Sequence, residues 1–189
     1  ALAISADGRT AVSGSFDSSA IRWSLTRNSA EQVLRFHESA VNAVALTPDG
    51  RVITGGEDGK IAVWRPGAVT PETVLSGHVA PIVSLAVSPD GATLYVSTNQ
   101  NTVSVVDTAT RTRTGSIPVG NHPQGLSVTP DGATLYVANQ LDGTVTVQPL
   151  PAGLPATLAL GDGPVAFGRF IAPATPAKLA IEYFHAGFG

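Results

Sequence analysis

The sequence contains no cysteine among its 189 residues. Within this chain, that excludes disulfides, thiolate zinc sites, iron–sulfur clusters and thioether-attached haem. Positive charge is also scarce: 11 Lys and Arg stand against 14 Asp and Glu, so there is no basic excess to bind a phosphate backbone. No apolar run approaches the roughly 18–20 residues that span a bilayer. We therefore expect no nucleic-acid partner and no membrane span.

The sequence also shows no N-terminal leader. The chain lacks an initiator Met and opens with Ala1 to Ser5 directly before a turn. We expect it to be a piece of a longer protein. The missing leader therefore gives no argument for the cytoplasm.

Turn-forming residues, by contrast, are plentiful, with 20 Gly and 14 Pro scattered along the chain. Four turns read Ala-Asp-Gly or Pro-Asp-Gly, and their Asp residues recur at intervals of 42, 41 and 41 residues. Gly supplies the positive φ that closes such a hairpin. Carboxylates placed one per repeat would not converge on a metal or a substrate. We therefore interpret all four as turn formers: Asp7, Asp49, Asp90 and Asp131.

Each repeat contains four short apolar segments, which in the second repeat are 41–47, 51–54, 60–65 and 73–76. Four short strands in a unit of this length are typical of one blade of a β-propeller. A single sheet covers its two faces by stacking on its neighbours. The sequence therefore predicts an all-β β-propeller fold with four four-stranded blades, at about 1–40, 41–81, 82–122 and 123–163.

The remaining residues predict the start of a fifth blade at 164–171, followed by a linker and C-terminal tail at 172–189. Residues 179–185 resemble the opening of small modules in secreted bacterial proteins, and the alternative for them is one more strand. Four blades and a partial fifth would close only a very small ring. We expect an open arc from a larger ring, whose unpaired faces and edges could lead to self-association.

The first two repeats resemble the WD-repeat family, through Arg35 to His37, Thr54 to Gly59 and Ile61 to Trp64. In that family a His, a Ser or Thr, an Asp and a Trp are joined by buried hydrogen bonds, which stabilise only when every member is satisfied. The resemblance implies a structural network rather than a ligand site. Its members here would be His37, Thr54, Asp58 and Trp64, then Ser13, Asp17 and Trp23 in the first repeat, and His78 before the third.

The third and fourth repeats are similar to the YVTN-type repeat of bacterial and archaeal surface propellers, through residues 94–99 and 135–139. That resemblance implies a periplasmic, cell-surface or secreted bacterial protein. The first 90 residues are also similar to WD-repeat modules of periplasmic proteins that carry a c-type cytochrome. Such a domain needs a Cys-x-x-Cys-His motif, so it would lie outside this chain.

No catalytic, cofactor or metal site emerges from the sequence. No Gly-rich loop precedes a helix, and the four His residues fall in four different repeats without metal-ligand spacing. Arg111 and Arg113 could place two guanidinium groups on one strand face, but a solvated edge is the favoured interpretation.

We therefore predict a non-enzymatic scaffold that needs no cofactor and binds a protein partner or another domain of its own polypeptide. The alternative is an accessory propeller of a c-type-cytochrome-linked redox protein, or of another enzyme whose catalytic part lies elsewhere. Function on a stiff scaffold concentrates in its loops, here those after the third strands and before the first. The candidate binding residues are Arg27, Asn28, His78, Pro81, Asn121, His122 and Gln124.

Overall fold

The computed structural model describes residues 1–161 and residue 164, which form sixteen strands and no helix. The first two sheets are β1 (Leu2–Ile4), β2 (Thr10–Gly14), β3 (Ser19–Ser24) and β4 (Ser29–Arg35), then β5 (Val41–Leu46), β6 (Val52–Gly56), β7 (Ile61–Trp64) and β8 (Thr73–Leu75). The other two are β9 (Ile82–Val87), β10 (Thr93–Thr98), β11 (Thr102–Asp107) and β12 (Thr112–Pro118), then β13 (Pro123–Val128), β14 (Thr134–Asn139), β15 (Thr144–Pro149) and β16 (Ala156–Ala159).

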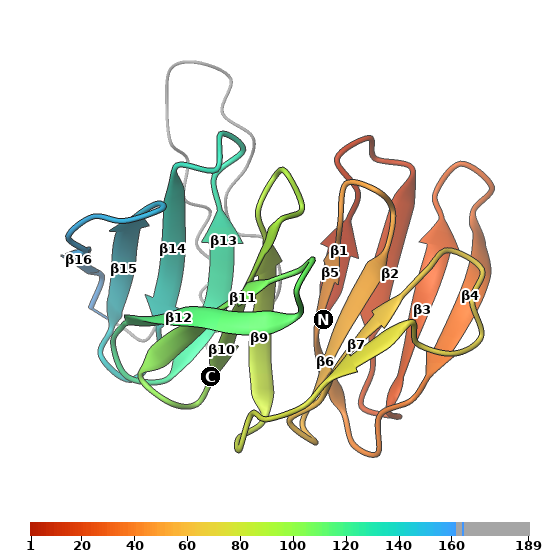
Figure 1. Ribbon diagram of the computed structural model, residues 1–189, viewed down its shortest axis with the longest axis horizontal. Helices are drawn as coiled ribbons and strands as arrows, with labels where there is room; N and C mark the ends of the chain where they lie inside the picture. The colour runs from red at the N-terminus through yellow and green to blue at the C-terminus, as the bar shows by residue number, and fades with distance from the viewer. Residues whose placement is uncertain (162–163, 165–189) are drawn as a thin grey trace, which may run out of the picture.

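Within each sheet the strands pair antiparallel in chain order, so every sheet is one meander of four. Figure 1 shows the four sheets side by side in an open arc, with the first blade on the right and the fourth on the left. The prediction of four four-stranded propeller blades is confirmed. The predicted fifth blade at 164–171 and the tail at 172–189 lie, except for Pro164, outside the described residues.

The Asp-Gly turns are built alike in all four blades. In the third blade the Ser88 hydroxyl donates to Asp90 Oδ1 at 2.5 Å, and the Ala92 N–H donates to the same oxygen at 3.0 Å. These hydrogen bonds hold the pKa of Asp90 below its ordinary value of 3.8. Gly91 follows with a φ of 76°, a conformation that favours glycine. The equivalent carboxylates of Asp7, Asp49 and Asp131 accept the same two kinds of hydrogen bond.

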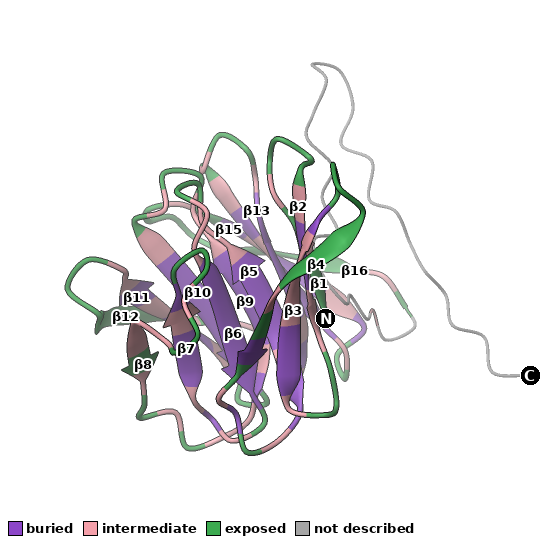
Figure 2. Cartoon of the chain, turned by 90° about the vertical axis from the view of Figure 1, so that its right-hand side faces the viewer, coloured by how far each residue is buried: buried purple, intermediate pink, exposed green. Residues whose placement is uncertain are grey.

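The hydrophobic core lies between successive blades. The first strand of each blade (β1, β5, β9 or β13) is an edge strand, and it packs against the first strand of the next blade along the chain. Because side chains alternate across a strand, each inner blade sends one set of residues to each neighbour: on β6, Val52 packs towards the first blade and Ile53 towards the third. We call these interfaces seam 1/2, seam 2/3 and seam 3/4. Figure 2 shows burial concentrated in the inner strands, whereas β4 is mostly exposed.

One face of the first blade has no blade against it among the described residues. Leu2 and Ile4 lie on this face, with exposed fractions of 50% and 55%. Their cross-strand partners are Ser13 and Ala11, and Ala11 in turn pairs with Trp23. Trp23 is therefore on the open face, at the position where Trp64 of the second blade is buried in seam 1/2.

Candidate functional site

Seam 1/2 is closed by a continuous chain of side-chain hydrogen bonds. Trp64, which has no exposed surface, donates its indole N–H to Thr54 Oγ1 at 3.1 Å. Thr54 Oγ1 lies 2.8 Å from His37 Nε2, and His37 Nδ1 lies 3.1 Å from Asp58 Oδ1. One arrangement of protons satisfies every member: Thr54 donates to Nε2, and Nδ1–H donates to the carboxylate. These four are the residues that the WD-repeat resemblance singled out.

The carboxylate of Asp58 ends this chain and also anchors the backbone. It accepts hydrogen bonds from the N–H groups of Lys60 at 3.0 Å and Glu38 at 3.2 Å. Burial raises the pKa of Asp58, but the hydrogen bonds from Lys60, His37 and Glu38 together outweigh it, so the pKa lies below 3.8. Asp58 is therefore ionised at neutral pH and fixed in place.

The first blade has a serine, an aspartate and a tryptophan at the matching positions, but no histidine joins them among the described residues. Trp23 donates its indole N–H to Ser13 Oγ at 2.9 Å. Asp17 instead accepts from the N–H and hydroxyl of Ser19, at 2.9 and 2.6 Å. Ser13, Asp17 and Trp23 therefore form two separate local contacts and not one network.

The third blade departs furthest from the expected network. His78 makes no side-chain hydrogen bond with any described residue. The strand register puts Val96 at the position of Thr54 and Val106 at that of Trp64. Neither valine side chain can accept or donate a hydrogen bond, so His78 does not join such a network among the described residues.

The fourth blade uses a polar cluster of which the sequence analysis named only Asn121, as a candidate binding residue. Asn139 Nδ2 donates to Thr144 Oγ1 at 3.1 Å and to Thr146 Oγ1 at 2.9 Å. Asp142, in the next turn, accepts from the N–H and side-chain amide of Asn121, both at 2.7 Å. The signal was present, because Asn139 ends the Tyr-Val-Ala-Asn run that carries the YVTN-type resemblance.

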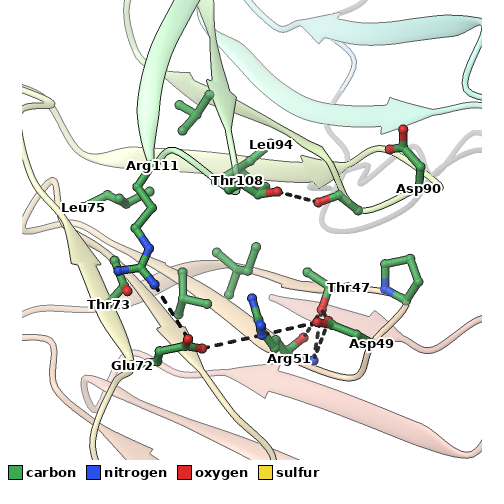
Figure 3. Close-up of a pocket in the computed structure, with 16 residues that line it drawn as sticks. Thr47, Asp49, Arg51, Glu72, Thr73, Leu75, Asp90, Leu94, Thr108 and Arg111 are labelled. Atoms are coloured by element: carbon green, nitrogen blue, oxygen red, sulfur yellow. Dashed lines mark hydrogen bonds and ion pairs between the residues drawn. The ribbon is translucent and has the colours of Figure 1, made fainter.

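A cavity of about 290 Å³ opens in seam 2/3, beside the Asp-Gly turns of the second and third blades (Figure 3). Its apolar floor comes from both blades and consists of Ile53, Val63, Leu75, Leu94 and Val106. At its rim lie Arg51, Glu72 and Arg111 from opposite sides of the seam. Val106 is a small residue at the position that Trp64 fills in seam 1/2, which accounts for the open space.

The rim of this cavity is electrostatically organised around Glu72, whose side chain is 14% exposed. Arg65 Nη2 lies 2.7 Å from Glu72 Oε1, Arg51 Nε lies 3.5 Å from Oε2, and Arg111 reaches across from the third blade to 3.7 Å from Oε1. The Arg65 hydrogen bond, assisted by the other guanidinium groups, lowers the pKa of Glu72. The buried hydroxyl of Thr73 has no hydrogen-bond partner among the described residues.

Sequence reasoning missed Arg51 and Glu72, and it named Arg111 but favoured a solvated edge for it. Only the replacement of tryptophan by Val106 hinted at a cavity. The candidate loop residues fall into two groups. Arg27 and Asn28 lie in the β3–β4 turn, at the same end of their blade as the Asp-Gly turn. The others lie at the opposite end: His78, Pro81, Asn121 and His122 precede the first strands of later blades, and Gln124 is the second residue of β13. No single surface contains them all.

Comparison with known proteins adds the family. Residues 28–65 match the model of the WD domain, G-beta repeat. Residues 60–158, just over half of the chain, match the model of the YNCE-like beta-propeller. The chain belongs to the YNCE-like beta-propeller family. This YNCE-like propeller is also similar to the small ribosomal subunit protein RACK1y of Oryza sativa subsp. japonica, with 45% identity over 56 residues. That match covers 29% of this chain and 17% of the rice protein.

Two further features are absent from the described residues. They contain no group of three or more His, Asp or Glu side chains placed to hold a metal ion. They also contain no helix long and apolar enough to cross a membrane. Propellers with WD-type repeats serve as protein-interaction scaffolds, and the cavity in seam 2/3 is the feature of this one that needs explanation.

Proposed function

We propose that this YNCE-like propeller is a non-catalytic scaffold that binds a protein partner, or another domain of its own polypeptide, in the envelope or secreted fraction of a bacterium. The YVTN-type resemblance of the third and fourth repeats supports the location. The rice relative is by its name a protein of the small ribosomal subunit. A role within a larger assembly is therefore compatible with the fold.

The observation that carries the proposal is the cavity in seam 2/3. Its volume of about 290 Å³ lies just below the range of about 300–1,000 Å³ that is typical of small-molecule pockets. It suits a single apolar side chain of a partner, and such buried anchors supply most of the binding energy in protein interfaces. The charged side chains of Arg51, Glu72 and Arg111 surround the opening and can orient the segment that carries the anchor.

The test fills the cavity. Peptides selected from a displayed library against the wild-type chain are compared by isothermal titration on Val106→Trp, which copies the residue of seam 1/2. We expect binding at least about tenfold weaker, a loss of about 1.4 kcal/mol. Val33→Trp, on the exposed strand β4, makes the same change away from the cavity and should leave binding unaltered. Equal binding to the Val106→Trp protein would show that the cavity is not the docking site.

A further inference from the structure

Seam 2/3 holds a second, smaller cavity at the opposite end of the blades, with a volume of about 130 Å³. It lies where the loop before β9 meets the turn between β10 and β11. Its lining consists of Gly77, His78, Val79, Ala80, Thr98, Gln100, Thr102, Ser104 and Arg113. The corresponding end of seam 1/2 is filled by the ring of His37.

One difference between the second and third blades explains why His78 cannot take the place that His37 has in seam 1/2. Gly56 lets His37 approach, because a Cβ at that position would lie 2.4 Å from His37 Nδ1. The equivalent position in the third blade is Thr98, as both residues pair with the first residue of the innermost strand. The Cβ of Thr98 therefore excludes the ring from that place. His78 stays half-buried at the cavity wall without a hydrogen bond to any described residue.

The cavity presents hydrogen-bond donors and no acid. Arg113 Nε donates to Gly115 O at 3.2 Å, and both terminal nitrogens of its guanidinium lack a hydrogen bond to any described residue. Gln100, Thr102 and Ser104 add an amide and two hydroxyl groups. Arg113 is the one permanently charged side chain in the lining, so the site carries positive charge that nothing in it neutralises.

We propose that this cavity binds a small oxyanion, either a carboxylate or a phosphate, between Arg113 and His78. A guanidinium group pairs with two oxygens of such an anion, and the imidazole N–H and the hydroxyl groups supply further donors. The volume admits a small group of this kind and not a large ligand. The site is separate from the cavity of the proposed function and does not depend on it.

Burial of His78 sets how the site should respond to pH. Burial lowers the pKa of His78, and the nearby charge of Arg113 lowers it further. The ring is therefore neutral at neutral pH and offers one N–H donor. A bound anion would favour the protonated ring, which has two donors. By linkage, affinity should increase as the pH falls towards the pKa of His78.

The experiment follows the imidazole resonances of the full chain by NMR, with the signals of His78 assigned from their loss in His78→Gln. Inorganic phosphate, acetate, and one peptide with a free or an amidated C-terminus are titrated separately. We expect saturable shifts of His78 and an upward shift of its pKa. Shifts of His78 with phosphate only would identify the ligand as a phosphate group. Shifts with acetate and the free-carboxylate peptide only would identify it as a carboxylate.

Two variants test the residues that carry the proposal. Arg113→Gln should weaken binding about tenfold or more, as expected for loss of a charge-assisted hydrogen bond. Thr102→Val removes one hydroxyl with little change of shape and should weaken binding less. Arg9→Gln, which removes the same charge from an exposed turn of the first blade, should bind as the wild type does. Unsaturable shifts for every anion, or equal weakening in Arg9→Gln and Arg113→Gln, would overturn the proposal.

Discussion

Seams 1/2 and 2/3 lie on the two sides of the second blade and are built from equivalent positions, yet they are closed differently. In seam 1/2, Trp64 and His37 both bond to Thr54, and the space between the blades is filled. In seam 2/3, Val106 and Val96 occupy the positions of Trp64 and Thr54, and two cavities remain. The difference shows that blade packing here does not require the polar network.

Seam 2/3 is held together mainly by apolar contact, to which the Arg111–Glu72 ion pair adds one charged link at the rim. Ile53, Ile82, Leu85, Leu94 and Val96 form a continuous buried cluster between the two blades. Burial of such side chains stabilises the fold by about 25 cal/mol per Å² of apolar surface. This stabilisation does not depend on hydrogen-bond geometry at the blade ends. The ends of the seam are thus released from a structural role, which leaves room for the two cavities.

The largest expected effect comes from removing the tryptophan that distinguishes the filled seam. Trp64→Ala should lower the free energy of unfolding by about 3–5 kcal/mol, because it leaves a cavity and removes the donor to Thr54. Trp23→Ala is the control, since Trp23 holds the equivalent position on the open face of the first blade. Urea unfolding measures both. Equal losses would mean that seam 1/2 gains nothing special from its tryptophan.

A smaller effect is expected at the centre of the network. Thr54→Val copies Val96 and keeps the side-chain volume, but it leaves His37 Nε2 and Trp64 Nε1 without their partner. Stranding buried polar groups should lower the free energy of unfolding by about 1–3 kcal/mol. Thr54→Ser retains the hydroxyl and should recover part of the loss. If the valine variant is as stable as the wild type, the network contributes no stability and seam 1/2 is held by apolar packing, as seam 2/3 is.

The comparison also shows what the sequence could predict. The spacing of the blades follows from local turn chemistry: β5, β9 and β13 begin at Val41, Ile82 and Pro123, each eight residues before the Asp of an Asp-Gly turn. His37, Thr54, Asp58 and Trp64 come together in the structure because each lies at a fixed register position.

The cavities could not be predicted in the same way. They depend on how side chains from two blades meet across a seam, a relation that one repeat does not encode. Arg111 and Glu72, which are 3.7 Å apart, lie on different blades. Whether the ring of His78 can take the place that His37 has in seam 1/2 depends on the single Cβ of Thr98. Arg111 and Arg113 are two residues apart, yet they line different cavities of the same seam.

The smallest expected effect concerns Asp58, whose place in the third blade is taken by the uncharged Gln100. The pKa of Asp58 is below 3.8 in the folded chain. Asp58 therefore stabilises the fold above its unfolded pKa, and this contribution is lost as the pH falls through the folded pKa. Asp58→Asn should cost about 1 kcal/mol near neutral pH.

In strong acid the wild type has lost the same charge, so the difference between it and Asp58→Asn should shrink. Unfolding midpoints in urea across this pH range measure that convergence. Gln100→Asn shortens the corresponding side chain of the third blade without removing a charge, and any effect it has should not change with pH. A gap between Asp58→Asn and wild type that stays constant into acid would mean that the carboxylate charge does not stabilise seam 1/2. The difference between the seams would then come from shape and neutral hydrogen bonds alone.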